Sequence, residues 1–261
     1  MSSAPKVYPY RWVILLAFML ISAVVQIQWL AHAAVARPAE VFYEGQFDPS
    51  SFFNIDFLAM VYMLVYLVMS FPASYMIATY GIRVGISIGA VLAGIAGLMK
   101  GLFADSFTVV VVAQVGLAIA QPFILNAVTA VSVRWFPLRE RGMAAGFSAL
   151  AQYIGIVIAM LVTPFMVGSD PAKPGYGTGF ESMLLTYGWL TFAVAVVALV
   201  LLREEPPTPP STETMQRHSF TEGVRHILKQ RDMQITLLLF LVGLGIFNAV
   251  SSMTDSIAEN A

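Results

Sequence analysis

Long apolar segments separated by shorter polar ones dominate the chain. With a wide hydropathy window, seven segments are each longer than an ordinary buried helix. The hydrocarbon core of a bilayer requires about 20 residues at helical rise, so each segment predicts a membrane-spanning helix. The predicted spans are residues 12–36, 55–79, 84–103, 107–131, 143–167, 182–202 and 233–253.

The polar linkers differ in length and kind. Two are tight turns, one carries charge, and two are longer and contain Gly and Pro. The linker at 203–232 is long and charged, includes four prolines at 206, 207, 209 and 210, and predicts a loop plus a short amphipathic helix near 220–228.

Composition supports an all-α, polytopic membrane protein. Hydrophobic residues make up 58% of the 261, charged residues only 11%, and the mean hydropathy is +0.77, whereas soluble domains carry about 25% charge. The net charge of −1 does not suggest nucleic-acid binding. There is no cysteine, and three scattered histidines do not form a metal site. We therefore expect no enzyme activity, cofactor or metal.

Lysine and arginine are distributed unevenly between the two sides that alternating spans define. Eleven lie on the side of the amino terminus and three, Arg37, Lys100 and Lys173, lie on the other. The positive-inside rule then predicts a multi-pass cell-membrane protein with a cytoplasmic amino terminus. Residues 31–33 resemble a signal-peptide cleavage site, but the apolar run before them is longer than such a segment, so we expect it to be retained as the first span.

Six spans, a basic loop and a seventh span resemble a major facilitator transporter cut after its first half. Such transporters have two six-helix halves. We therefore predict a transporter half at 1–202, a cytoplasmic central loop at 203–232 and the first helix of a truncated second half at 233–261. The expected partners are the lipid bilayer, a small-molecule substrate and the missing carboxy-terminal half. Either a fragment or a truncated gene product is consistent with this layout.

The turn between spans two and three carries part of the facilitator signature G-x-x-x-D-R-x-G-R. Gly81 and Arg83 remain, but Ala78 and Thr79 stand where the acid and the following basic residue are usual. One interpretation is a weakened gating turn. The other is a helix-ending glycine followed by a positive-inside arginine.

Longer runs carry a more specific resemblance. They are Asp56 to Met63, Phe71-Pro72-Ala73-Ser74, Gln28-Trp29, Ala120 to Leu125, Trp135-Phe136 and Gly245 to Ala249. Together they resemble the feline leukaemia virus subgroup C receptor family of facilitators, whose members are linked to choline, ethanolamine or haem transport. The resemblance implies that Trp29 and Gln121 match positions lining the substrate site.

Polar side chains inside spans are costly and mark either pathways or helix contacts. Helical spacing puts Gln26 and Trp29 on one face of span one and Gln28 on another. An aromatic face attracts a quaternary ammonium by about 2 kcal/mol when dry, so Trp29 favours a choline-like cation. The alternative is that these residues only pack helices. The candidate binding residues are Trp29, Gln121, Gln26, Tyr62, Tyr66, Gln114, Gln152 and Asn248.

Charged residues near span ends are the candidates for gating. Asp56 lies near the outer end of span two, where it could attract cations or simply be solvated. The candidate gating residues are Asp56, Gly81, Arg83, Arg134, Arg139 and Arg141. Small residues spaced four apart let helices approach closely, and they predict packing surfaces at Gly81, Gly85 and Gly89 and at Gly142 and Gly146.

The sequence thus predicts a transporter that moves a small organic solute, with a choline-like cation favoured, by alternating access between two halves. Two alternatives stay open. The substrate could be an organic anion or metabolite, or the chain could be a truncated, non-transporting assembly partner.

Overall fold

The computed structural model describes residues 6–48, 52–168, 170–171, 175–210, 225–226 and 228–252. The chain divides into two compact units, 1–212 and 213–261. The first unit is an all-helical bundle, with no strand among its described residues. This confirms the predicted fold class.

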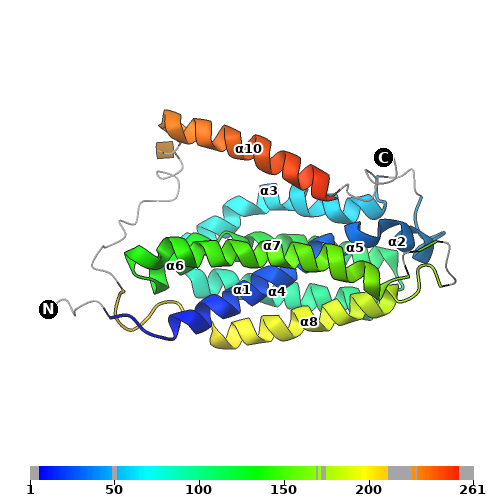
Figure 1. Cartoon of the computed structure of the whole chain (residues 1–261), viewed down its shortest axis with the longest axis horizontal. Helices are drawn as coiled ribbons and strands as arrows, with labels where there is room; N and C mark the ends of the chain where they lie inside the picture. The colour runs from blue at the N-terminus through cyan, green and yellow to red at the C-terminus, as the bar shows by residue number, and fades with distance from the viewer. Residues whose placement is uncertain are drawn as a thin grey trace. The chain divides into compact units, whose positions relative to one another are not determined.

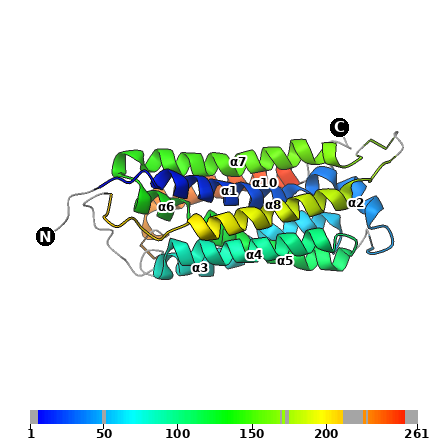
Figure 2. The same ribbon diagram turned by 90° about the horizontal axis from the view of Figure 1, so that it is seen from below.

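Six stretches of the first unit are helical, long and apolar enough to cross a membrane. The helices run nearly side by side along the bundle (Figures 1 and 2). They are α1 (Arg11–Leu30), α3 (Ile55–Tyr80), α4 (Ile82–Leu102), α5 (Phe107–Leu125) with α6 (Val128–Trp135), α7 (Arg141–Met166) and α8 (Phe180–Leu201). The predicted first six spans are therefore confirmed as helices.

Short elements lie at both ends of the bundle. A 3-10 turn η1 (Ala33–Val35) and α2 (Ala36–Phe42) follow α1, and the 3-10 turn η2 (Leu138–Glu140) precedes α7. We call the two ends the α2 end and the α6 end after the helices that lie there (Figure 1).

The fourth predicted span is divided rather than continuous. The helix α5 ends at Leu125, three residues after Pro122, and α6 begins at Val128. The Asn126 side chain bonds to α3: Nδ2 donates to Ser70 Oγ and Ser74 Oγ, each at 2.9 Å, and Oδ1 accepts from Tyr66 Oη at 2.6 Å. These bonds hold the break between α5 and α6 against the neighbouring helix.

Glycines mark the closest helix contacts, only partly as predicted. A Cβ at Gly89 would lie 2.8 Å from Ile124 Cγ1 of α5, and one at Gly85 would lie 2.5 Å from Ile77 Cγ1 of α3. Both packing predictions are confirmed. For Gly142 and Gly146 the prediction is wrong, because a Cβ there would meet nothing within 4 Å. A close helix contact outside the predicted positions puts Gly155 of α7 against the backbone of Ala23 on α1.

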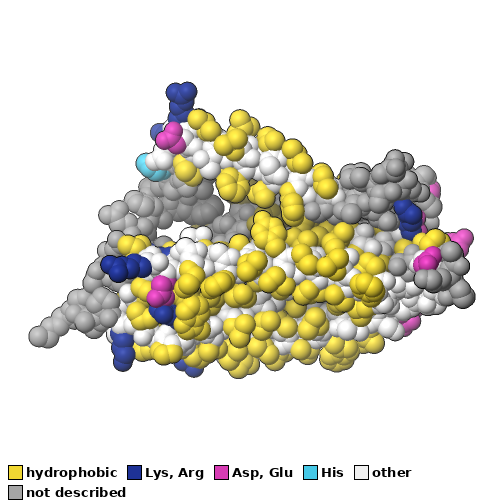
Figure 3. Space-filling view, viewed as in Figure 1, with side chains coloured by type: hydrophobic (Ala, Val, Ile, Leu, Met, Phe, Trp, Pro, Cys, Tyr) yellow, Lys and Arg dark blue, Asp and Glu magenta, His cyan; other side chains and the backbone are white. Residues whose placement is uncertain are grey.

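Hydrophobic side chains cover the flank of the bundle. In the view of Figure 3 they spread over its middle, and charged side chains gather toward its ends. Exposed apolar residues on α3 and α7 include Leu67, Val68, Phe71, Leu161 and Phe165. A surface of this kind suits a hydrocarbon environment.

The second unit contains α10 (Arg231–Ser252), which confirms a helix in the seventh predicted segment. Most of the amphipathic helix predicted near 220–228 lies outside the described residues.

Candidate functional site

A buried lysine lies inside the bundle. Lys100, in the last turn of α4, is 1% exposed, and no other charged side chain is buried among the residues that the structure describes. Its Nζ donates to the Gln28 backbone oxygen at 3.2 Å, to Gln28 Oε1 at 3.1 Å and to Gln114 Oε1 at 2.7 Å. Three acceptors match the three N–H bonds of an ammonium group. Lys100 thus lies at the end of α4, on the side where the sequence count puts it, but inside the bundle rather than in solvent.

The hydrogen bonds of Lys100 continue to every long helix of the bundle. Gln114 of α5 donates through Nε2 to the Leu58 oxygen of α3 at 2.7 Å. Gln28 of α1 donates through Nε2 to the Tyr187 oxygen and to Thr191 Oγ1 of α8, at 3.1 and 3.0 Å. Tyr187 Oη in turn shares a hydrogen bond with Thr163 of α7 at 3.0 Å. We call this set, which joins α1, α3, α4, α5, α7 and α8, the Lys100 network.

Two aromatic candidates lie next to this network. The rings of Trp29 and Tyr62 have centroids 6.4 Å apart and planes inclined by 31°. The indole Nε1 of Trp29 donates to the Ala59 oxygen of α3 at 3.1 Å. Trp29 is 5% exposed and Tyr62 1%. Within the first unit this pair is therefore covered rather than open to solvent.

Two amide candidates also meet. Gln121 Nε2 of α5 donates to Gln26 Oε1 of α1 at 2.9 Å. Gln28 instead bonds to α8 and Lys100, which confirms that Gln26 and Gln28 face different directions. Ser22 Oγ, one turn before Gln26, and Tyr62 Oη are buried without a hydrogen-bond partner among the described residues.

The remaining candidates lie elsewhere. Gln114 is bonded at both its oxygen and its nitrogen in the Lys100 network, and Tyr66 bonds to Asn126 at the break after α5. Gln152 is half-buried on α7, and the side chain of Asn248 in α10 lies outside the described residues. The structure thus forms two separate pairs, Trp29 with Tyr62 and Gln26 with Gln121, and the other four candidates belong to neither pair.

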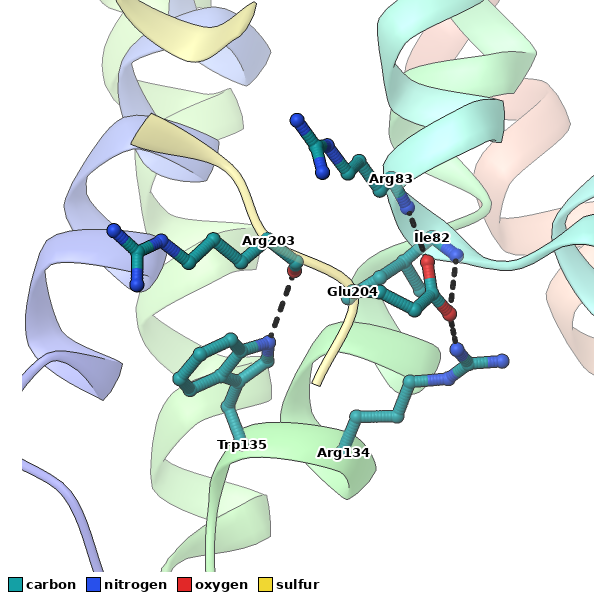
Figure 4. A network of polar contacts seen from close by, with 6 residues as sticks. All are labelled: Ile82, Arg83, Arg134, Trp135, Arg203 and Glu204. Atoms are coloured by element: carbon teal, nitrogen blue, oxygen red, sulfur yellow. Dashed lines mark hydrogen bonds and ion pairs between the residues drawn. The ribbon is translucent and has the colours of Figure 1, made fainter. Parts of the chain in front are cut away.

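A carboxylate that the sequence analysis did not single out occupies the α6 end. Glu204, just after α8, accepts from the backbone N–H of Ile82 at 3.2 Å and from that of Arg83 at 2.8 Å (Figure 4). It also pairs with Arg134 of α6. Unpaired N–H groups at a helix start favour an anion, so Glu204 caps α4. It supplies from a distant segment the acid that Ala78 does not.

The other gating candidates surround this carboxylate or lie apart from it. Gly81 joins α3 to α4 with φ of 101°, and a Cβ there would lie 2.2 Å from Glu204 Oε1. Arg83 and Arg139 are exposed, and Arg141 Nε donates to the Phe136 oxygen at 3.3 Å. Asp56 is exposed in the first turn of α3, at the α2 end.

A second ion pair closes the α6 end between the start of α1 and the start of α7. Arg11 Nη1 lies 3.1 Å from Glu140 Oε2. Nearby, Trp135 Nε1 donates to the Arg203 oxygen at 3.3 Å (Figure 4). The ion pair ties α1 to the start of α7, and the indole bond ties α6 to the segment after α8.

Sequence reasoning missed Lys100 and Glu204 for different reasons. Lys100 follows Gly97 at a helical step and precedes Gly101, and it is the one formal charge inside its apolar run. A single charge inside an apolar run was the sequence signal that could have identified Lys100 as a buried residue. Glu204 stands in a charged linker beside Glu205, and nothing in the local sequence distinguishes the two.

Comparison with known proteins agrees with the fold. "Solute carrier family 49 member A3" of Xenopus tropicalis is 28% identical over 97% of this chain and 52% of its own length. "Choline/ethanolamine transporter flvcr2a" of Danio rerio is 28% identical over 97% and 55%. The human "Choline/ethanolamine transporter FLVCR2" is 24% identical over 97% and 49%. The chain spans about half the length of these curated relatives.

A solved structure shares the fold at low identity. It is the crystal structure of a bacterial homolog to the human lysosomal transporter Spinster, in an inward-facing and unoccupied conformation. The TM-score is 0.64 at 21% identity, covering 85% of this chain and 50% of that one. The sequence profile described as Major Facilitator Superfamily matches residues 7–259. The chain therefore belongs to the Major Facilitator Superfamily.

Proposed function

We propose that residues 1–202 form the amino-terminal half of a transporter that moves a small organic solute, with a choline-like cation as the favoured substrate. The family and the transporter names of the relatives support transport rather than enzyme chemistry. The carboxy-terminal half would complete a pathway between the two halves, in the manner of alternating access. The single observation that carries the substrate class is the pairing of Trp29 with Tyr62.

The aromatic pair has the chemistry to hold a quaternary ammonium. A cation is attracted to an aromatic face when it lies within about 6 Å of the ring centroid. With centroids 6.4 Å apart, one ammonium group can lie within about 6 Å of both rings. No formal anion is needed for this attraction, which suits a bundle whose described acids are not buried.

The amide pair supplies the polar end of the site. Gln26 and Gln121 each carry an amide that can donate and accept. They already bond to each other. A substrate hydroxyl or amine would replace this amide–amide hydrogen bond with a bond to the substrate, at a small net cost in free energy. Gln26 lies three residues before Trp29 on one face of α1. A molecule with an ammonium at one end and a hydroxyl at the other fits this order.

The orientation in the cell membrane rests on charge. The α6 end carries Arg11, Arg83, Arg134, Arg139 and Arg141. Basic residues prefer the cytoplasmic side, so we assign this end and the amino terminus to the cytoplasm. The 203–232 linker, which begins just after α8, adds five more basic residues: Arg203, Arg217, Arg225, Lys229 and Arg231.

Choline uptake tests the proposal. This chain, joined to the carboxy-terminal half that completes the pathway, is reconstituted in vesicles, and uptake of labelled choline is compared for wild type, Trp29→Ala and Gln121→Ala. We expect each substitution to reduce uptake about five- to thirtyfold, since each removes a contact worth about 1–2 kcal/mol. Trp189→Ala is the matched control, because Trp189 is 51% exposed on α8, and its uptake should equal that of wild type. Unchanged uptake in both test variants would overturn the assignment of the pocket.

One observation favours an organic anion as a second candidate. The charge buried in the bundle, on Lys100, is positive. Its three donors are occupied, which weakens this alternative. Uptake in the same vesicles separates the two: a cation site takes up labelled choline and is inhibited by unlabelled ethanolamine, whereas an anion site takes up a labelled carboxylate and not choline.

A further inference from the structure

The Lys100 network holds the backbone on both sides of the Trp29 contact. Trp29 of α1 donates its indole N–H to the oxygen of Ala59 on α3. The residue before each of these, Gln28 on α1 and Leu58 on α3, is bound by the network. The bonds run from Gln28 through Lys100 and Gln114 to Leu58. A path of three hydrogen bonds thus runs parallel to the single bond that orients the indole.

Lys100 is the residue on which this parallel path depends. It donates two hydrogen bonds to Gln28, one to the side-chain oxygen and one to the main-chain oxygen. Its shortest bond, 2.7 Å, is to Gln114, whose other amide group reaches Leu58. A charged donor makes stronger hydrogen bonds than a neutral one, especially away from water. Removing the ammonium would leave Gln28 and Gln114 with buried oxygens that lack their donor.

The neighbouring backbone leaves room for this arrangement. A Cβ at Gly97 would lie 3.2 Å from Gln28 Nε2 and 3.2 Å from Thr191 Cβ. Glycine at this position therefore lets the Gln28 amide fit between α4 and α8. The Gln28 side chain is 1% exposed and fixed at both its oxygen and its nitrogen. It cannot reorient without breaking several bonds at once.

We propose that Lys100 is a positioning residue for the Trp29–Tyr62 pair: by binding Gln28 and, through Gln114, Leu58, it sets the spacing of α1 and α3 at the aromatic site. The effect of Lys100 on substrate binding rests on the proposed function. The effect of Lys100 on the position of the Trp29 indole is independent of the proposed function. Lys100 itself does not touch the substrate, because its three donors are taken within the protein.

Fluorine NMR of the full chain labelled with 5-fluorotryptophan tests the placement directly. The sequence contains four tryptophans, and Trp29→Phe assigns the Trp29 line. Lys100→Met keeps the length of the side chain and removes its donors. We expect the Trp29 line to shift in Lys100→Met while the line of Trp189, which is exposed on α8, stays in place. Gln114→Leu, which cuts only the path to α3, should shift the same line less.

A matched control separates positioning from a general loss of packing. Thr163→Val removes an equally buried hydrogen bond at the far end of the network, to the Tyr187 hydroxyl. Gln28 binds the Tyr187 backbone oxygen instead, so the Trp29 line should not move in this variant. A Trp29 line unmoved in folded Lys100→Met, or moved equally in Thr163→Val, would overturn the proposal. If Lys100→Met fails to fold, the Trp29 line is compared between Gln114→Leu and Thr163→Val instead. A line that does not move in Gln114→Leu, or that moves equally in Thr163→Val, would then overturn the proposal.

Transport kinetics then test the consequence for the substrate. We expect Gln114→Leu to raise the KM for choline about fivefold with little change in maximal rate, because a misplaced pair weakens binding. A wild-type Trp29 line that choline does not shift, with full uptake in Trp29→Ala, would overturn the proposed substrate site. In that event, a shift caused by Lys100→Met would still establish the positioning role.

Discussion

The carboxylate of Glu204 pairs with the guanidinium of Arg134, and this contact joins the segment after α8 to the end of α6. The same carboxylate accepts from the first two backbone N–H groups of α4. One side chain thus links three elements at the α6 end (Figure 4). The turn between α3 and α4 has Ala78 where an acid is usual, and Glu204 from the segment after α8 places a carboxylate at that turn.

Replacing the Glu204 carboxylate should destabilise the bundle more than replacing the neighbouring carboxylate of Glu205. In Glu204→Gln the ion pair with Arg134 and the anionic cap of α4 are lost. Because the side chain is 33% exposed, we expect a modest cost of about 1–2 kcal/mol, seen as a lower unfolding temperature in detergent. Glu205→Gln removes a neighbouring exposed carboxylate and should have little effect. Equal shifts in the two variants would contradict the cap.

The glycine at the same turn should resist substitution. Gly81 has φ of 101°, and an added Cβ would collide with the Glu204 carboxylate. Gly81→Ala therefore combines backbone strain with displacement of the cap, and we expect a loss of about 2 kcal/mol or more. Gly146→Ala is the control, because a Cβ there meets open space in a helix and should be neutral or stabilising by up to about 1 kcal/mol. Thermal unfolding of both variants measures the difference. A Gly81→Ala variant as stable as wild type would show that the turn tolerates a side chain.

Sequence alone predicted the helices well, because an apolar run of membrane length has few other stable structures. It predicted the opposite directions of Gln26 and Gln28 from helical spacing. It could not show which glycine faces a neighbour: Gly89 does and Gly146 does not, although both have the same spacing pattern. Helical periodicity gives a face of one helix, whereas a contact requires the second helix to be placed.

The polar contacts were the least predictable part of the site. Glu204 reaches residues more than a hundred positions earlier in the chain. Lys100 obtains its acceptors from α1 and α5. Neither pairing leaves a local signature, and a lysine near a span end normally extends to the membrane surface. Only the arrangement of helices shows that three oxygens converge on its ammonium group.

The break after α5 offers a third prediction. Asn126 is bonded by its side chain to Ser70, Ser74 and Tyr66 of α3. Asn126→Leu keeps the volume but leaves these groups without their partner, so we expect a loss of about 2–3 kcal/mol. Tyr66→Phe removes one bond of the set and should cost about 1 kcal/mol. Unfolding in detergent compares the two. A larger effect in Tyr66→Phe than in Asn126→Leu would show that Asn126 does not organise the cluster.

Alkaline pH tests the packing at the α2 end, outside the membrane-spanning helices. Tyr43 is buried there and donates to the Ala104 oxygen at 2.6 Å. Burial, with Asp105 and Glu181 nearby, raises the pKa of its phenol above the ordinary value. The folded protein therefore holds this proton more tightly than the unfolded chain. The resulting stability is present below about pH 10, the usual tyrosine pKa, and is lost as the pH rises beyond it.

Tyr43→Phe should remove that pH dependence. At about pH 7.5 the variant lacks one buried hydrogen bond and should be less stable by about 1 kcal/mol. Near pH 10.5 the gap from wild type should narrow, because only the wild type must keep a phenol protonated against the solvent. Unfolding temperatures of both proteins at the two pH values measure the gap, and the other titrating groups cancel in the comparison. A gap that stays constant would mean that the Tyr43 proton is held no more tightly in the folded protein than in the unfolded chain.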